Sequence, residues 1–470
     1  MSLAQSAQSA HPTQPDHTAG ALADLAAGLT GRLATPADAD WDQVRSAWNL
    51  AVDQRPDAVA QVADAADVGK VVAAALASGR RVAPQGTGHA AAALGDLSGT
   101  ILLRTDRLRE VTVDAAARSA RVGAGVLWAE VIDAAAAHGL AALSGSAPDV
   151  GVVGYTLGGG FSWFARSFGL AVNQVTAVEL VTGDGEFHRV TATSTGVDAE
   201  LFWAVRGGGA NVGVVTALEF DLFERTEVYA GALFFPIERA AEVLRAYRSW
   251  TADLDEAATT SIRLLRVPPL PELPEPLRGN AFVVVNGVID LPAGPAGDLL
   301  APIRALEPAI DMFRPMPVPA LAAVAMDPPQ PVPAAVDGMK LAVLDDEVIG
   351  RLLEIAGPGV ATPLLTVDLR HLGGAAGRPV DGGGVVDHLE GEFLVSAVGM
   401  AMTPEMGAAV QGAITAALAA LAPFGTEHAF ATFLEHKVDP SVLWGSGLDR
   451  LRATRSAVDP HGIIRANHEV

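Results

Sequence analysis

Apolar and polar residues along the first half of the chain follow two different periods, as alternating helices and strands require. Ala58–Val62 and Arg80–Ala83 are short apolar runs typical of strands, and Asp67–Ser78 between them has apolar residues at helical spacing. This strand–helix–strand unit carries the chain to Pro84, where a glycine-containing loop begins. Upstream, Ala19–Leu33 also has helical spacing, and we expect it to pack as an accessory helix.

The pattern beyond that loop predicts short strands broken by charged or glycine turns. Gln174–Thr182 and Gly185–Thr191 flank a glycine-rich turn and predict a hairpin, while Ala129–His138 has the spacing of a helix. The remaining strand-like or apolar runs are Thr100–Arg104, Glu110–Asp114, Ala117–Val122, Leu201–Val205 and Val212–Phe220.

The pattern changes at about Glu224, where longer alternating strands begin. Proline-rich connections at Pro268–Pro276 and Pro315–Pro333 separate these strands, and proline cannot lie inside a central strand. We therefore expect loops that border an antiparallel sheet covered by helices. Since 470 residues are too many for one compact core, two domains of α+β architecture are expected. The clearest strands are Ala281–Val288, Leu364–Leu372 and Phe393–Met400.

The net charge and the absence of cysteine exclude several kinds of binding partner and chemistry. The 54 acidic and 32 basic residues give a formal charge of −22, which argues against nucleic acid or an anionic membrane surface. There is no cysteine, so disulfides, thiolate chemistry and cysteine-ligated metals are excluded, and we expect no metal site. Any redox chemistry must come from a cofactor.

Two segments could in principle be a targeting signal or a membrane span. Met1–Ala19 is polar and has no charged start before an apolar core, so we expect a disordered tail and no secretory signal. Met406–Thr426 is uncharged but mostly alanine, too weakly apolar for a membrane span, and is expected to be a buried helix. These features predict a cytoplasmic protein and leave its oligomeric state open.

Glycine is concentrated in two stretches, Pro84–Ala90 (PQGTGHA) and Gly145–Leu170, which includes Gly158-Gly159-Gly160. Glycine lets backbone N–H groups approach an anion closely, so both stretches predict a phosphate-binding cradle. The usual dinucleotide fingerprint is missing, because Trp128 stands where the Gly123-Ala124-Gly125 turn needs its third glycine. A Rossmann fold is therefore disfavoured.

These motifs carry a family resemblance. Arg81–Ala90, Gly145–Gly160 and Asp198–Thr216 resemble the FAD-binding core of the vanillyl-alcohol oxidase / p-cresol methylhydroxylase (PCMH-type) superfamily. Arg450–Asn467 is similar to the C-terminal module of its berberine-bridge-enzyme branch. The resemblance implies a two-domain fold with a discontinuous FAD domain. The expected segments are residues 1–35 (tail and accessory helix), 36–224 (first part of the FAD domain), 225–424 (substrate domain) and 425–470 (return to the FAD domain).

The resemblance also implies FAD as cofactor. His89 matches a histidine that bonds covalently to the flavin, and Ala147 matches a cysteine that often forms a second bond, so one covalent bond is expected, as in the hydroxynicotine oxidase type. Val150 matches a position on the dioxygen route, where leucine is associated with dehydrogenase behaviour. Gly158–Gly160 are expected to offer N–H groups and a helix start to the pyrophosphate. The residues expected to bind the cofactor are Gln85, Gly86, Thr87, Gly88, His89, Ala90, Ala147, Val150, Gly151, Gly154, Tyr155, Gly158, Gly159, Gly160, Asn211, Gly213, Val215 and Asn467.

The strand at Thr366–Gly374 is implied to cover the flavin, so either Arg370 or His371 is expected to face the substrate as a catalytic residue. Similar proteins carry a tyrosine base near the C-terminus, but this chain has Phe430-Ala431-Thr432-Phe433 there. His371 is a possible replacement, with Glu435 or His436 as weaker ones, and an amine substrate needs no strong base.

The expected activity is that of an FAD-dependent oxidoreductase. It takes a hydride from a carbon bearing oxygen or nitrogen in a small, secondary-metabolite-like substrate and passes the electrons to dioxygen, giving peroxide. Two alternatives remain open: a dehydrogenase that uses another electron acceptor, and a non-catalytic binder of small aromatic compounds on a retained FAD fold.

Overall fold

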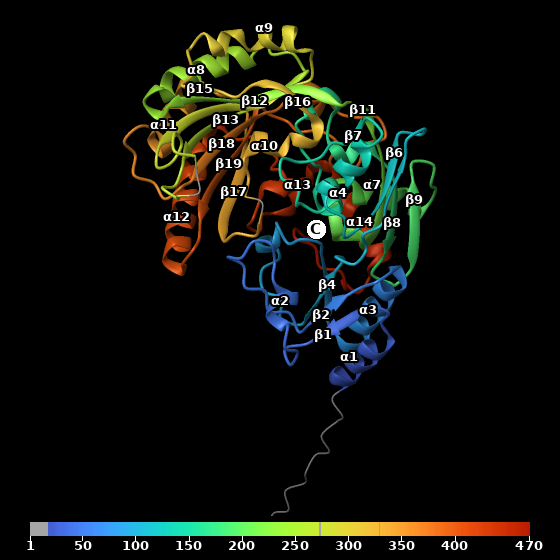
Figure 1. Cartoon of the computed structure of the whole chain (residues 1–470). Coiled ribbons are helices and arrows are strands. Elements are labelled where there is room, and N and C mark those ends of the chain that lie inside the picture. Colours follow the sequence, from blue (N-terminus) through green and yellow to red (C-terminus); the bar gives the residue numbers. More distant parts are fainter. Residues whose placement is uncertain (1–16, 272–273, 329) are drawn as a thin grey trace, which may run out of the picture.

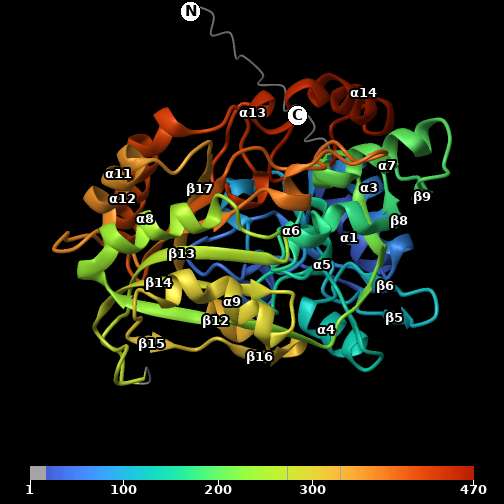
Figure 2. The ribbon, with the colours of Figure 1, turned by 90° about the horizontal axis from the view of Figure 1, so that it is seen from above.

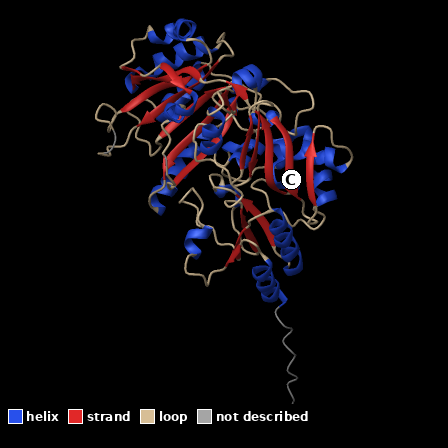
Figure 3. Ribbon diagram, turned by 45° about the vertical axis from the view of Figure 1, so that its right-hand side comes forward, coloured by secondary structure: helices blue, strands red, loops and turns tan. Residues whose placement is uncertain are grey.

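The computed structural model describes residues 17–271, 274–328 and 330–470, so most of the expected tail lies outside the described residues. Three larger sheets organise these residues, and helices cover each of them (Figures 1 and 3). The expected α+β architecture is confirmed.

The first sheet has four strands in the order β1-β2-β4-β3, in which β2 and β3 run parallel to β4. Helix α3 (Ala65–Ser78) connects β2 to β3, as the apolar pattern predicts. The accessory helix α1 (His17–Gly28) is shorter than expected, because Arg32–Ala34 leaves it to pair with β2 as strand β1. The other strands are β2 (Ala58–Gln61), β3 (Arg81–Gln85) and β4 (Thr100–Arg104), and a short helix, α2 (Trp41–Arg45), precedes β2.

The second sheet is antiparallel and has five strands in the order β5-β6-β10-β8-β9. The predicted hairpin is confirmed as β8 and β9. The strands are β5 (Val111–Asp114), β6 (Ser119–Gly123), β8 (Val175–Val181), β9 (Phe187–Thr191) and β10 (Val214–Asp221). The helices of this part are α4 (Trp128–Ala136), α5 (Val152–Leu157), α6 (Ala165–Phe168) and α7 (Val197–Gly208), and β7 (Leu140–Ala141) pairs with β11 (Phe223–Glu224).

The third sheet has eight antiparallel strands, and its apolar face packs under four helices on the outer side of the molecule (Figures 1 and 2). The proline-rich β16 pairs with β12 outside the main strand order, where a proline costs least. The strands are β12 (Glu227–Pro236), β13 (Ala258–Arg266), β14 (Ala281–Ile289), β15 (Ile310–Asp311), β16 (Arg314–Pro317), β17 (Ala334–Leu341), β18 (Thr366–His371) and β19 (Phe393–Met400). The covering helices are α8 (Ala240–Thr251), α9 (Ala293–Arg304), α11 (Asp346–Ala356) and α12 (Pro404–Leu421), and the short α10 (Ala322–Ala325) precedes β17.

Helix α12 differs from the expected buried helix. Only one of its faces is buried, through Val410, Ile414, Ala417 and Leu421, and this face packs on β17 and β19. By length and composition alone, Pro404–Phe424 is the one helix among the described residues that could cross a membrane, with 22% of the tested window buried.

The end of the chain returns to the first two sheets. Helices α13 (Pro440–Trp444) and α14 (Leu448–Val458) lie along one side of the molecule (Figure 2), and α14 packs on α7. Residues 463–465 then run beside β3, where Val82 N donates to Ile463 O at 2.8 Å and Arg465 N donates to Val82 O at 2.8 Å. The end of the chain is therefore bound to the edge of the first sheet at β3.

Candidate functional site

A cavity of about 420 Å³ lies where the glycine-rich loops, strand β18 and the C-terminal segment meet. Its volume is within the range of small-molecule and cofactor sites. Most of the expected cofactor-binding residues line it: Gln85, Gly86, Thr87, Gly88, His89, Ala90, Ala147, Val150, Gly151, Gly154, Tyr155, Gly158, Gly213, Val215 and Asn467. Gly159, Gly160 and Asn211 do not line it, and of the two expected catalytic residues only Arg370 does.

The loop after β3 presents its backbone to this cavity. None of the N–H groups from Gly86 to Ala90 has a protein acceptor among the described residues. Gly88 has φ +85°, and a Cβ there would come within 2.9 Å of Ala47. Consecutive unpaired N–H groups form a concave anion site, so this loop fits a phosphate.

Helix α5 adds a second set of donors. Gly151 is its N-cap and has no capping side chain, and the N–H groups of Val153 and Gly154 have no acceptor among the described residues. Both residues line the cavity. A side chain at Gly154 would project into open space, so glycine keeps this wall clear for a ligand.

The expected helix start at Gly158–Gly160 is wrong. Gly158 is the C-cap of α5, so the negative end of that helix lies there, and the positive end lies at Gly151. A Cβ at Gly159 would come within 2.6 Å of Phe430, and one at Gly160 within 2.7 Å of Tyr155 and Ala171. These two glycines are required for close packing behind the cavity.

Asn211 is also placed differently from the expectation. It is buried, and its Nδ2 donates to Gly208 O and to His468 O at 2.9 and 2.8 Å. It therefore holds the C-terminal segment in place, and its neighbours Gly213 and Val215 line the cavity instead.

Asn467 and the residues around it close one side of the cavity. Asn467 Nδ2 donates to Ala90 O at 2.7 Å, and Lys437 Nζ donates to Asn467 O at 2.6 Å. Arg81 donates to the backbone oxygens of Gly462 and Ile464 and pairs with Glu469. The tip of the glycine loop and the end of the chain therefore form one wall.

His89 is held at the cavity by two neighbours. Its ring stacks on Trp48 with ring centroids 4.1 Å apart, and Trp48 Nε1 donates to Asp149 Oδ2 at 2.5 Å. Burial lowers the pKa of His89, and the charge of Asp149 acts in the opposite direction. A neutral imidazole in a fixed orientation fits the role of a flavin-linking histidine.

Strand β18 decides between Arg370 and His371. Val367 and Leu369 belong to the apolar cluster under the helices, so Asp368 and Arg370 face the cavity side of the sheet. Arg370 Nε donates to Asp368 Oδ2 at 3.0 Å, and its guanidinium lies 4.9 Å from the ring centre of Phe433.

His371 is wrong as the expected substrate base. It points to the other face of the strand, where its Nε2 lies 3.3 Å from Arg166 Nη1 and its ring contacts Phe393. Burial and the charge of Arg166 lower the pKa of His371 to about 3. The weaker candidates, Glu435 and His436, do not line the cavity either.

The segment that replaces the expected tyrosine contributes apolar and hydroxyl groups. Phe433 and Thr432 line the cavity, and Thr432 Oγ1 is buried without a hydrogen-bond partner among the described residues. Phe430 stacks on Phe433 behind them, with ring centroids 5.8 Å apart.

The cavity contains further residues that sequence reasoning did not select. The run of glycines before Asn211 was a visible signal for Gly207, Gly208 and Gly209. Phe161, Ser146 and Trp444 had no such signal in the sequence. The residues missed include Gly207, Gly208, Gly209, Ser146, Phe161, Thr432, Phe433, Trp444 and His468. No group of His, Asp or Glu among the described residues is arranged to hold a metal ion.

Comparison with known proteins agrees with this geometry. Residues 56–191 match the family described as "FAD binding domain". The chain is 31% identical over 258 residues to (R)-6-hydroxynicotine oxidase of Paenarthrobacter nicotinovorans, covering 55% of this chain and 52% of that protein. It is 34% identical over 196 residues to glucooligosaccharide oxidase of Sarocladium strictum, covering 40% and 38%. The chain thus matches about half or less of the length of these relatives.

The solved structures that resemble the chain cover nearly all of it. Physcomitrella patens BBE-like 1 superposes with a TM-score of 0.83 at 19% identity, covering 95% of this chain and 98% of that one. 6-Hydroxy-D-nicotine oxidase of Arthrobacter nicotinovorans gives 0.76 at 22% identity, covering 93% and 97%. The chain therefore has the fold of these two structures, and its residues 56–191 match an FAD-binding domain.

Proposed function

We propose that this chain is an FAD-dependent oxidoreductase, and specifically an oxidase that acts on a C–O or C–N bearing carbon of a small substrate. The observation that carries the proposal is the cavity itself. Unpaired backbone N–H groups of the Pro84–Ala90 loop and of α5 provide an anion cradle, and Arg370 and Phe433 lie on the β18 side. Such a cavity suits a dinucleotide and a small substrate.

The chain's own residues would bind and orient the cofactor. The N–H groups of the glycine loops suit the pyrophosphate, and the stacked His89 suits a single covalent bond to the flavin ring. When bound, FAD supplies the hydride acceptor and returns two electrons and two protons to dioxygen as hydrogen peroxide. The absence of cysteine agrees with one covalent bond.

The described lining residues include no Asp, Glu or Lys. Proton removal from a substrate hydroxyl would therefore need a water path or a histidine, whereas an amine that binds unprotonated needs no strong base. Phe161, Phe433 and Leu157 would exclude water from the reacting carbon. This favours amine substrates within the proposed class.

The experiment is anaerobic titration of the purified yellow protein with a panel of amines, alcohols and hydroxylated aromatics. We expect one class to bleach the flavin, and air to restore the colour with release of peroxide. Bleaching that air does not reverse would indicate a dehydrogenase. A flavoprotein that binds these compounds without bleaching would indicate a binder, and protein that takes up no FAD would contradict the proposal.

Covalent attachment is tested separately. Acid precipitation of fully loaded protein should leave the flavin on the pellet, and a tryptic peptide containing His89 should carry the flavin mass. Release of all the flavin into the supernatant would show that His89 forms no bond.

A further inference from the structure

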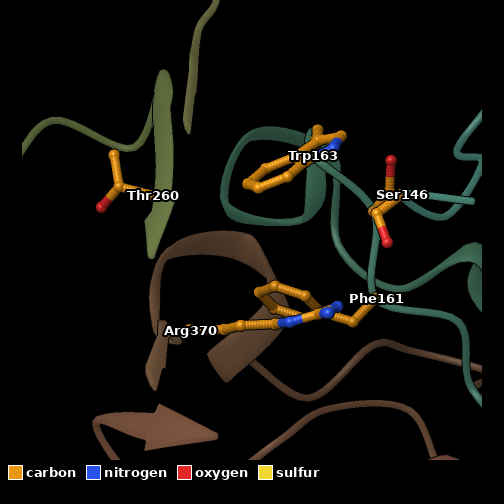
Figure 4. A pocket seen from close by; sticks show the side chains of 6 residues that line it. Ser146, Phe161, Trp163, Thr260 and Arg370 are labelled. Atoms are coloured by element: carbon orange, nitrogen blue, oxygen red, sulfur yellow. The ribbon is translucent and has the colours of Figure 1, made fainter. Parts of the chain in front are cut away.

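A narrow side pocket joins the main cavity at the substrate-domain side. Ser146, Phe161 and Arg370 line both spaces, and Trp163 borders only the side pocket (Figure 4). Its volume is about 10 Å³, which is room for about one water-sized group. The side pocket therefore suits a single small group of a ligand whose body lies in the main cavity.

Arg370 brings unused hydrogen-bond donors to this junction. Its Nε is engaged by Asp368, but its Nη1 and Nη2 have no partner in the part of the chain that the structure describes. The side chain is 22% exposed, and its guanidinium is held over the ring of Phe433. A fixed guanidinium with two free NH₂ groups is a fork suited to a carboxylate.

Trp163, which borders the side pocket, carries a second donor without an acceptor. Trp163 Nε1 is buried and has no hydrogen-bond partner among the described residues. Indole nitrogen can only donate, so it requires an oxygen from a ligand or from water. Two residues that line the side pocket, Arg370 and Trp163, therefore carry donors without a partner among the described residues.

The buried carboxylate beside the side pocket serves two cations. Asp368 is shared by two guanidinium groups, since Arg263 Nε lies 3.6 Å from Asp368 Oδ1 while Arg370 holds Oδ2. One carboxylate balances only one of the two cations. Asp327, at the rim, accepts from Ser146 Oγ at 2.9 Å and is exposed to solvent. A buried positive charge is favourable only with an anionic partner.

We propose that the substrate is a carboxylate, bound by the Arg370 fork with one oxygen in the side pocket beside Trp163. The proposal rests on the oxidase function proposed above, because the carbon that loses hydride must lie in the main cavity. The carboxylate fixes the orientation of the substrate and takes no part in the electron transfer.

The test uses the flavin-loaded protein and two acid–amide pairs, benzoate with benzamide and phenylacetate with phenylacetamide, which differ in charge at nearly constant shape. Binding is followed by perturbation of the flavin spectrum. In at least one pair we expect the acid to bind about tenfold or more tightly than the amide, as charged hydrogen bonds allow. Arg370→Met should abolish that preference, and Arg370→Lys should retain part of it.

Arg450→Met is the matched control, because Arg450 also lies over an aromatic ring, Trp203, and pairs with a carboxylate, Glu200, but on the surface. It should leave the preference unchanged. Equal binding of acid and amide in both pairs, or no binding of either acid, overturns the proposal. So does an Arg370→Met protein that still prefers the acid, which would assign the guanidinium to the flavin. Flavin uptake by all these proteins keeps the test separate from the proposed function.

Discussion

The Nε2 atom of His89 lies 3.8 Å from Oδ1 of Asp149, and both atoms are buried without hydrogen-bond partners among the described residues. The other carboxylate oxygen of Asp149 accepts from Trp48 Nε1. A carboxylate that faces one ring nitrogen favours the tautomer with hydrogen on that nitrogen. The second nitrogen, Nδ1, would then keep its lone pair for bonding to the flavin.

We therefore expect Asp149→Asn to lower the fraction of flavin that is covalently attached several-fold while FAD still binds. The uncharged amide stabilises the required tautomer less. The measurement is the share of flavin that stays with acid-precipitated protein. Asp198→Asn is the control, because it removes the carboxylate from the His188–Asp198 pair, which does not line the cavity. Full attachment in Asp149→Asn would show that Asp149 only supports Trp48.

The docking of the chain end gives a second prediction. The carboxylate of Asp459 is buried and accepts from Ile463 N and Ile464 N at 2.7 and 2.9 Å. Asp459→Ala leaves both groups unsatisfied and should lower the free energy of unfolding by about 2–5 kcal/mol, with weaker retention of FAD. Truncation before Leu448 should abolish retention.

Thermal unfolding and gel filtration with free FAD measure these effects. Arg452→Ala, on the exposed side of α14, should change neither the melting temperature nor the flavin content. A truncated protein that keeps all its flavin would contradict the return of residues 425–470 to the FAD domain.

The role of a glycine can be predicted from the sequence when it depends on the glycine's own backbone. It cannot when the role depends on a side chain from a distant part of the chain. The glycines of the Pro84–Ala90 loop act on their own backbone, so the sequence alone indicates that the loop's N–H groups are open to a ligand, and its binding of phosphate stays a prediction. Gly159 accommodates Phe430, and no local pattern reveals a contact with a residue 271 positions away. Gly160 accommodates Tyr155 and Ala171, which are near in sequence but are brought against it by the turn after α5.

The alternation of apolar and polar residues along β18 already distinguishes Arg370 from His371, although the sequence analysis left both as candidates. His371 shares its face with Val367 and Leu369, and an apolar face is the one that packs under helices. This alternation already favoured Arg370 for the cavity. Cavity residues such as Phe161 and Ser146 could not be found in this way, because they meet β18 only in the folded protein and lie about 200 residues before it in the sequence.

Stability should depend on pH through Glu435. Burial, and next the charge of Asp337, raise the pKa of Glu435 from 4.5 to about 8. Between these values the folded protein holds a proton that the unfolded chain has released, so the contribution of Glu435 to stability is fully present below about pH 4.5 and is lost as the pH rises to 8. The slope for one proton is at most about 1.4 kcal/mol per pH unit.

Urea unfolding at several pH values from 5 to 8 measures this slope. Glu435→Gln carries no titrating proton and should lose less stability across that range than the parent protein. Parallel curves for the two proteins would show that Glu435 is ionised in the folded state despite its burial.

The last prediction concerns dioxygen and rests on Val150, which lines the cavity and packs against the apolar cluster of the second sheet. Its carbonyl oxygen accepts from Trp128 N at 3.0 Å, so its backbone is fixed and a larger side chain must use the space of the cavity wall. One added methylene in a close-packed passage removes room that a diatomic molecule needs. We therefore expect rapid reoxidation of the reduced parent protein by air, and slowing by about tenfold or more in Val150→Leu, with flavin reduction by substrate nearly unchanged.

Val153→Leu makes the same change at another position of the cavity wall and should leave reoxidation fast. Stopped-flow measurement of the two half-reactions decides the matter: equal reoxidation of parent and Val150→Leu would exclude a gate at this residue, and slow reoxidation of the parent itself would favour the dehydrogenase alternative.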